Sequence, residues 1–345
     1  MSRPLALTLG EPAGIGPDIT LAAWARRAET KLPPFYVLAD PQYLARRAML
    51  LGLDVPIELV TPATALAAFP HALPVAALGA AATSEPGRPD ATSAPTAIAS
   101  INRAVEDVVA GAAAALVTNP VAKTVLYKSG FGDPGHTEYL AKLSFERTGN
   151  PAWPVMMLWS PELAVVPVTI HMALRDVPRR LTRDLIFETG RVVARDLVAR
   201  FGIPHPRLAV AGLNPHAGED DALGSEDSSI VLPAIERLVA DGIDARGPLA
   251  ADSMFHEAAR KTYDAALCMY HDQALIPIKT LAFDHAVNVT LGLPFVRTSP
   301  DHGTAFDIAG SGRADPSSLV AALRLAARLA TADQRKRQTP AAALT

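Results

Sequence analysis

Residues 265–271 read Ala-Ala-Leu-Cys-Met-Tyr-His, a short apolar run that ends in a histidine. An apolar run of this length is typical of a buried strand. The pattern recurs in residues 165–171, which end in His171, and in residues 208–216, where Asn-Pro precedes His216. Each histidine is therefore expected at the C-terminal end of a strand, which is the edge where open α/β sheets bind ligands.

Around these runs, strand and helix signals alternate along the chain. Residues 5–9 and 35–39 are predicted strands, and residues 19–28 and 43–51 are predicted helices. Such alternation indicates an α/β fold with a largely parallel sheet. The 345 residues exceed what one hydrophobic core usually serves, so two domains are expected.

The composition excludes several classes of protein. Hydrophobic residues make up 49% of the chain and charged residues 19%, which fits a globular protein with large buried sheets. The net charge of −3 favours neither a nucleic acid nor an acidic membrane as partner. Cys268 is the only cysteine, which excludes an intrachain disulfide and a thiolate metal cluster. No stretch approaches the ~18 apolar residues of a transmembrane helix, and the N-terminus lacks the apolar region of a signal peptide. A cytoplasmic location is therefore expected.

The repeated placement of His171, His216 and His271 favours a metal site. Three imidazoles from three strands can hold a divalent metal and leave one position open for substrate. No short metal-binding motif applies, because the histidines are far apart in sequence, and a single histidine at a strand end is more often structural. Imidazole ligands suit zinc, cobalt or iron.

Two carboxylates accompany these histidines. Asp272 directly follows His271, and Asp252 lies in the run 247–253. Either is a candidate for orienting a metal ligand or for proton transfer. For Asp252, a helix N-cap is an equally good interpretation.

Two glycine-containing turns are weaker candidates for ligand binding than the histidines. Residues 14–16 read Gly-Ile-Gly, but Ile19 stands where a dinucleotide fingerprint needs its third glycine, so a tight strand-to-helix turn is the better interpretation. Residues 134–138 read Pro-Gly-His-Thr-Glu, a turn at a helix start that suits an anion. A simple cap formed by Thr137 is the alternative, and without other support it is preferred.

Residues 279–297 combine few charges with many apolar side chains. Lys279 and Arg297 are candidates for holding a phosphate or carboxylate, and isolated surface cations are the alternative. The polar stretch 299–305 is predicted only as a loop, although such a loop is able to cover a cofactor.

Several long motifs in this chain occur together and in order. As a set they resemble the 4-hydroxythreonine-4-phosphate dehydrogenase family of pyridoxal 5′-phosphate biosynthesis. The motifs are residues 10–18, 135–138, 171–176, 212–219, 270–273 and 288–294.

The resemblance implies a fold and an assembly. The family has the isocitrate/isopropylmalate dehydrogenase-like fold, in which two α/β/α domains flank a cleft. The corresponding domains here are residues 1–132 with 300–345, and residues 133–299. The family forms homodimers with the active site at the subunit interface, so a second copy of the chain is expected as partner.

The resemblance also implies roles for individual residues. The metal ligands are His171, His216 and His271, with one of the three supplied by the partner subunit. The metal is zinc, with magnesium or cobalt as alternatives. The substrate-binding residues are His136, Thr137, Lys279, Asn288 and Arg297. The loop for the adenosine part of NAD or NADP contains Asp301, His302, Gly303 and Thr304. The candidates for the general base are Asp252, Asp272 and Lys279.

The implied reaction is the NAD(P)-dependent, metal-dependent oxidation of 4-phosphooxy-L-threonine to 2-amino-3-oxo-4-phosphooxybutanoate. This product decarboxylates to 3-amino-2-oxopropyl phosphate. One alternative is a dehydrogenase of a related phosphorylated sugar acid, 4-phospho-D-threonate or 4-phospho-D-erythronate. A more distant alternative is a phosphate acyltransferase of similar fold, which would bind neither the metal nor the nicotinamide cofactor.

Overall fold

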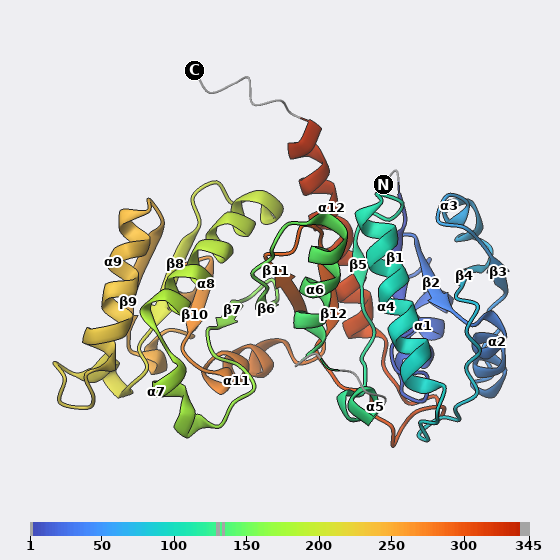
Figure 1. The fold of residues 1–345 in the computed structure, drawn as a ribbon, viewed down its shortest axis with the longest axis horizontal. Coiled ribbons are helices and arrows are strands. Elements are labelled where there is room, and N and C mark those ends of the chain that lie inside the picture. Colours follow the sequence, from blue (N-terminus) through green and yellow to red (C-terminus); the bar gives the residue numbers. More distant parts are fainter. Residues whose placement is uncertain (1–2, 129–131, 133–134, 339–345) are drawn as a thin grey trace. The chain divides into compact units, whose positions relative to one another are not determined.

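The structure is a computed structural model that describes residues 3–128, 132 and 135–338. The chain forms two compact units (Figure 1). The first contains the described residues of 1–154 and 293–331, and the second contains those of 155–292 and 332–345. The domain boundaries expected at residues 132/133 and 299/300 remain a prediction.

The first unit has a parallel sheet in the order β3-β4-β2-β1-β5-β12. Apolar side chains of α4 and α6 pack on one face of it, and the resulting core includes Ile101, Leu140 and Tyr36. The strands are β1 (Leu5–Thr8), β2 (Phe35–Ala39), β3 (Ile57–Leu59), β4 (Leu73–Ala77), β5 (Leu116–Val117) and β12 (Arg297–Pro300). The helices are α1 (Gly16–Ala25), α2 (Pro41–Leu50), α3 (Ala65–Ala68), α4 (Ser93–Val109), α5 (Lys123–Lys128), α6 (His136–Thr148) and α12 (Ser317–Gln338), of which the last belongs to this unit as far as Thr331.

The second unit has a mixed sheet in the order β11-β6-β7-β10-β8-β9. The pairs β11·β6 and β6·β7 are antiparallel, and the other pairs are parallel. The strands are β6 (Val155–Trp159), β7 (Ala164–Pro167), β8 (Arg207–Ala211), β9 (Asp244–Leu249), β10 (Ala265–Cys268) and β11 (Val287–Leu291). The α-helices are α7 (Val177–Arg180), α8 (Arg183–Asp196), α9 (Leu232–Ala240), α10 (Glu257–Arg260) and α11 (His271–Ala282). The short turns are η1 (Leu174–Asp176), η2 (Leu197–Phe201), η3 (Pro215–Gly218), η4 (Asp227–Val231) and η5 (Ala251–Ser253).

Strand β10 shows why its unit has helices on both faces of the sheet. Successive side chains of a strand point to opposite faces. Ala266 and Cys268 pack in the core that includes Ile278 of α11. Leu267 lies on the other face, where an added methyl group on Gly190 of α8 would come within 3.3 Å of it. Helices α11 and α8 therefore cover opposite faces, which confirms the α/β class.

The expected strands at the three histidines are present, in neighbouring positions. Strand β10 lies between β7 and β8 and is parallel to both. Because parallel strands end at the same edge of a sheet, the segments that carry His171, His216 and His271 all leave from one edge. Among the described residues, no helix is both long and apolar enough to span a bilayer.

Candidate functional site

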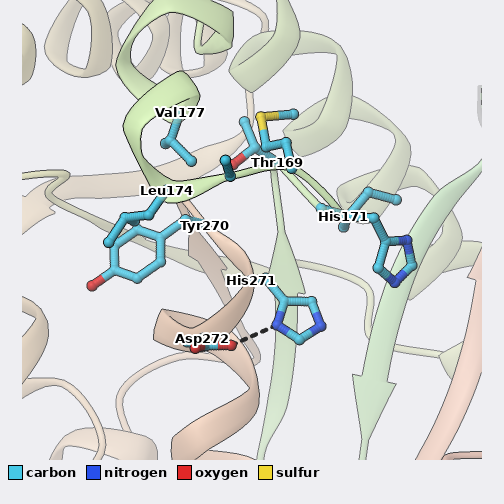
Figure 2. Close-up of a pocket in the computed structure, with 10 residues that line it drawn as sticks. Thr169, His171, Leu174, Val177, Tyr270, His271 and Asp272 are labelled. Atoms are coloured by element: carbon cyan, nitrogen blue, oxygen red, sulfur yellow. Dashed lines mark hydrogen bonds and ion pairs between the residues drawn. The ribbon is translucent and has the colours of Figure 1, made fainter.

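The histidines that follow β7 and β10 lie together at the edge of the sheet. His171 and His271 line a pocket of about 440 Å³ with the segment 169–174, Val177 and Tyr270. The two imidazole ring centroids are 5.8 Å apart. Figure 2 shows both rings near one another, each at the end of its own strand.

Asp272 fixes the orientation of the second imidazole. His271 begins helix α11, and its Nδ1 lies 2.7 Å from Oδ1 of Asp272, the contact that is dashed in Figure 2. A carboxylate that holds one ring nitrogen leaves the other nitrogen to bind a metal, and it also fixes the tautomer. Asp272 therefore contacts Nδ1 of His271 and leaves Nε2 on the other side of the ring.

His216 lies on a loop with unusual backbone geometry. Residues 216–221 all have positive φ, and Gly218 is the only glycine among them. The buried carboxylate of Asp227 stabilises the start of this loop, because it accepts hydrogen bonds from the backbone N–H groups of Leu213 and Asn214 at 2.6 and 3.0 Å. The Nδ2 group of Asn214 donates to the same carboxylate at 3.1 Å. The imidazole of His216 thus follows a turn that several hydrogen bonds to Asp227 hold in place.

His216 does not line the pocket of His171 and His271. Within the part of the chain that the structure describes, no three His, Cys, Asp or Glu side chains form a group able to hold a metal ion. The three-histidine site that includes a ligand from a partner subunit therefore remains a prediction.

The other candidates in this unit occupy separate positions. Asp252 lies inside the exposed turn η5, whose N-cap is Ala250, so the N-cap interpretation of Asp252 is wrong. Lys279 is half-buried on α11, and its Nζ lies 6.0 Å from the ring centroid of Phe283. Asn288 is half-buried in β11 opposite Leu158. None of the three candidates lines the pocket of the two histidines.

Arg297 is buried in the first unit. Its Nη2 donates to Oγ1 of Thr118 at 2.6 Å, and burial lowers the pKa of the guanidinium to about 10. A buried cation of this kind gains from a bound anion, which restores the interactions lost with water. The structure thus excludes the interpretation of Arg297 as a surface cation.

The predicted anion turn lies at the start of α6. His136 and Thr137 are the first two residues of this helix, and Gly135 is its N-cap. Thr137 therefore lies in the first turn and does not cap the helix, which corrects the preferred interpretation. The side chain of His136 lies outside the described residues.

The predicted cofactor loop packs on the first glycine turn. The backbone N–H of Ile15 donates to the carbonyl of Thr304 at 2.9 Å, and a Cβ atom on Gly14 would lie 2.9 Å from the same oxygen. Residues 14–16 lie where the connection from β1 enters α1, as the strand-to-helix turn interpretation predicts. In this loop, Nδ1 of His302 contacts the carbonyl of Gly303 at 3.0 Å, while its Nε2 is buried without a hydrogen-bond partner among the described residues.

Three buried polar residues near the histidines were not among the predicted site residues: Thr169, Asp227 and Gln273. Gln273 had a signal in the sequence, since it closes the motif Tyr-His-Asp-Gln at the start of α11. Asp227 had none, because it binds backbone groups 13 and 14 residues earlier in the chain.

Comparisons with known proteins agree with the resemblance seen in the sequence. The sequence model of the family described as "Pyridoxal phosphate biosynthetic protein PdxA" matches residues 31–326. A 4-hydroxythreonine-4-phosphate dehydrogenase of Bradyrhizobium diazoefficiens is 64% identical over 339 residues, which cover 96% of this chain and 98% of that protein.

Two solved structures are also similar. The 4-hydroxythreonine-4-phosphate dehydrogenase of Klebsiella pneumoniae is 36% identical and superposes with a TM-score of 0.83, covering 96% of this chain and 98% of that one. A terephthalate 1,2-cis-dihydrodiol dehydrogenase of Burkholderia xenovorans is 28% identical with a TM-score of 0.63, covering 94% and 98%.

Proposed function

The chain belongs to the PdxA family of pyridoxal phosphate biosynthetic proteins, and we propose that it oxidises 4-phosphooxy-L-threonine with NAD or NADP. The oxidation product, 2-amino-3-oxo-4-phosphooxybutanoate, is a β-keto acid that loses CO₂ to give 3-amino-2-oxopropyl phosphate. The observation that carries this proposal is the 64% identity to a 4-hydroxythreonine-4-phosphate dehydrogenase over 96% of the chain. The enzyme is therefore an oxidoreductase of pyridoxal 5′-phosphate biosynthesis.

The histidines fit a divalent metal. His171 and His271 offer neutral nitrogen ligands at one pocket, and Asp272 supplies the orienting carboxylate that metal-bound histidines commonly have. We propose zinc as the metal, with His216 as the third ligand. When bound, the metal would supply Lewis-acid polarisation of the substrate's secondary hydroxyl group.

The remaining chemistry falls to acidic and basic side chains. Asp272 is engaged with His271, so its first role is to hold that imidazole in place. Asp252 and Lys279 are the other candidates to accept the proton of the substrate hydroxyl group, and in that case Lys279 would act in its neutral form and leave Arg297 as the cation for the substrate anion.

The anionic substrate requires cations and hydrogen-bond donors. We assign the phosphate or carboxylate to Arg297 and Lys279, with His136, Thr137 and Asn288 as further binding residues. Arg297 is the best supported of these residues, because burial lowers the pKa of its guanidinium and a bound anion would offset the free energy lost on desolvation.

NAD or NADP is assigned to the loop of Asp301, His302, Gly303 and Thr304. The buried Nε2 of His302 fits this group, because it offers a polar atom that a ligand can bond. When bound, the cofactor supplies the hydride acceptor.

We further propose a homodimer whose active site includes residues of both subunits. Met172 and Leu174 line the histidine pocket and are 40% and 68% exposed. Ile276 and Phe283, on or next to α11, are 65% and 77% exposed. Large exposed apolar side chains beside a functional pocket suit a protein interface. The cytoplasm is the proposed location, with neither a membrane nor a nucleic acid as partner.

A substrate panel tests the function. Purified protein is given 4-phosphooxy-L-threonine, 4-phospho-D-threonate or 4-phospho-D-erythronate with NAD or NADP, and the absorbance of the reduced cofactor is followed with and without a chelator. The first substrate should be oxidised with the highest kcat/KM, and chelation should abolish turnover. Faster oxidation of either sugar acid would overturn the substrate assignment.

A further inference from the structure

A chain of hydrogen bonds crosses the three strand ends beneath the histidines. The backbone N–H and the Oγ1 of Thr169, beyond β7, donate to the carbonyl of Met269, beyond β10, at 3.3 and 2.6 Å. The N–H of Met269 donates to Oε1 of Gln273 at 2.6 Å. The Nε2 of Gln273 donates to the carbonyl of Gly212, beyond β8, at 2.8 Å.

Each link lies within five residues of a predicted metal ligand. Thr169 precedes His171 by two residues, Met269 precedes His271 by two, and Gly212 precedes His216 by four. Gly212 also packs directly on the His216 loop, since an added Cβ atom there would lie 2.8 Å from Cα of Ala217. Movement of the Gly212 carbonyl would therefore be transmitted to that loop.

The side chains of Thr169 and Gln273 can form these hydrogen bonds in only one orientation. Thr169 and Gln273 are 2% and 9% exposed, so water does not readily replace their partners. Gln273 must direct its oxygen toward an N–H and its amide NH₂ toward a carbonyl, which fixes both ends of the amide. The side-chain bonds of Thr169 and Gln273 add to the backbone pairing at this edge, where the bond from the Thr169 N–H to the Met269 carbonyl lies just beyond the ends of β7 and β10.

We propose that Thr169 and Gln273 are positioning residues that fix the spacing of the three strand ends, and with them the imidazoles of His171, His216 and His271. The inference rests on the proposed metal-dependent function. Groups that orient metal ligands typically change metal affinity by about 10- to 100-fold when they are mutated.

Four variants of the full-length protein test the proposal. Thr169→Val removes the hydroxyl group at similar volume, and Thr169→Ser retains it. Gln273→Met removes both bonds, and Gln273→Glu retains the acceptor for Met269 but places an oxygen against the Gly212 carbonyl. Cys268→Ala is the matched control, because it removes a fully buried side chain of β10 that has no part in the chain of bonds.

The probe is Co²⁺, and the readouts are its dissociation constant by chelator competition, its visible absorption spectrum and the thermal midpoint of the metal-free protein. We expect Thr169→Val, Gln273→Met and Gln273→Glu to bind Co²⁺ about 10- to 100-fold more weakly with an altered spectrum. Thr169→Ser should restore both the affinity and the spectrum. Cys268→Ala should lower the midpoint while both metal readouts stay at wild-type values.

Two results would overturn the proposal in different ways. If the Thr169 and Gln273 variants lose thermal stability but bind Co²⁺ as the wild type does, these residues are structural and the metal site stands. If the wild type binds no Co²⁺, or if His171→Ala leaves its affinity unchanged, the proposed metal site fails and the positioning role fails with it.

Discussion

At the scale of the residue, the proposed role of Arg297 in binding an anion rests on its buried charge. Burial lowers the pKa of its guanidinium to about 10, so the side chain keeps its charge at neutral pH but at a cost in desolvation free energy. Arg297→Met keeps the length of an apolar side chain and removes the charge. We expect KM for 4-phosphooxy-L-threonine to rise by about tenfold or more, because a charge-assisted hydrogen bond contributes about 1.5–3 kcal/mol. The thermal midpoint of the ligand-free protein should not fall.

Arg207→Met is the control for this prediction. Arg207 is partly exposed and pairs with Asp264 at 3.1 Å, far in sequence from the assigned substrate residues. Its loss should leave KM unchanged. A lower midpoint for Arg297→Met together with an unchanged KM would show that Arg297 is a structural residue.

Glu11 gives a prediction about pH. It is 1% exposed in the connection between β1 and α1, and burial raises the pKa of its carboxyl group above the ordinary value of 4.5. The folded state therefore holds this proton more tightly than the unfolded state. The charged carboxylate destabilises the fold at neutral pH, and the cost disappears as pH falls through the raised pKa to about 4.5.

Glu11→Gln removes the charge and keeps an oxygen for the N–H of Ala13. We expect the variant to have a higher thermal midpoint than the wild type at pH 7, with a difference that shrinks toward pH 4.5. The midpoints are measured by calorimetry across this range, with the exposed Glu29→Gln as control. A difference that grows as pH falls would contradict the prediction.

The position of a site residue could be predicted where the sequence next to it has a clear pattern. The apolar runs before His171 and His271 indicated strand ends, and the structure has β7 and β10 ending there. The partners of Gln273 and Asp227 could not be predicted in this way. Gln273 bonds Gly212, 61 residues away, so only the folded sheet brings the two together.

At the scale of the element, the loop that carries His216 depends on one carboxylate. Asp227→Asn replaces an acceptor oxygen with an NH₂ group that faces the N–H donors of Leu213 and Asn214. Amide exchange at Leu213 and Asn214 should become at least about tenfold faster, since each bond to a charged group contributes about 1.5–3 kcal/mol. Hydrogen exchange measured by mass spectrometry or NMR checks this result.

Asp221→Asn makes the same chemical change at an exposed position of the loop, where the carboxylate accepts from Ser228. Exchange at Leu213 and Asn214 should then stay at the wild-type rate. Equal acceleration in both variants would mean that net charge, and not the buried bonds of Asp227, holds the loop.

The sequence predicted the positions of elements better than their directions. The strand at residues 35–39 is β2 as expected, and the helices at 19–28 and 43–51 correspond to α1 and α2 with earlier starts. The antiparallel pairs β11·β6 and β6·β7 were not foreseen, because hydrophobic periodicity does not encode strand direction. Helix α8 stops at Asp196 and continues as the π-helix η2 before Gly202, whose φ of 73° ends it.

At the scale of the whole molecule, the two compact units each carry part of the proposed machinery. The proposed metal ligands, Asp252, Asp272, Lys279 and Asn288 belong to the second unit, and the remaining candidates belong to the first. This division explains why motifs spread over most of the sequence were needed to predict the function. On these proposed assignments, the metal ligands lie in one unit and the cofactor loop lies in the other.

Assembly of the dimer can be tested by mixing inactive variants. His171→Ala, His216→Ala and His271→Ala should each be inactive alone, because each lacks one metal ligand. If one imidazole comes from the partner subunit, a dimer of two different variants can still contain one intact site. Random mixing makes about half of the dimers mixed, so turnover should reach about a quarter of the wild-type value.

The pattern of recovery identifies the residue that crosses the interface. The rings of His171 and His271 lie together within one chain, so we expect His216 to be the ligand from the partner subunit. His216→Ala should then recover activity when mixed with either other variant, and the mixture of His171→Ala with His271→Ala should stay inactive. Mixtures are unfolded and refolded together so that subunits exchange, and dimers are quantified by sedimentation. If no mixture recovers activity while mixed dimers are present, all three ligands come from one chain and the shared site is wrong.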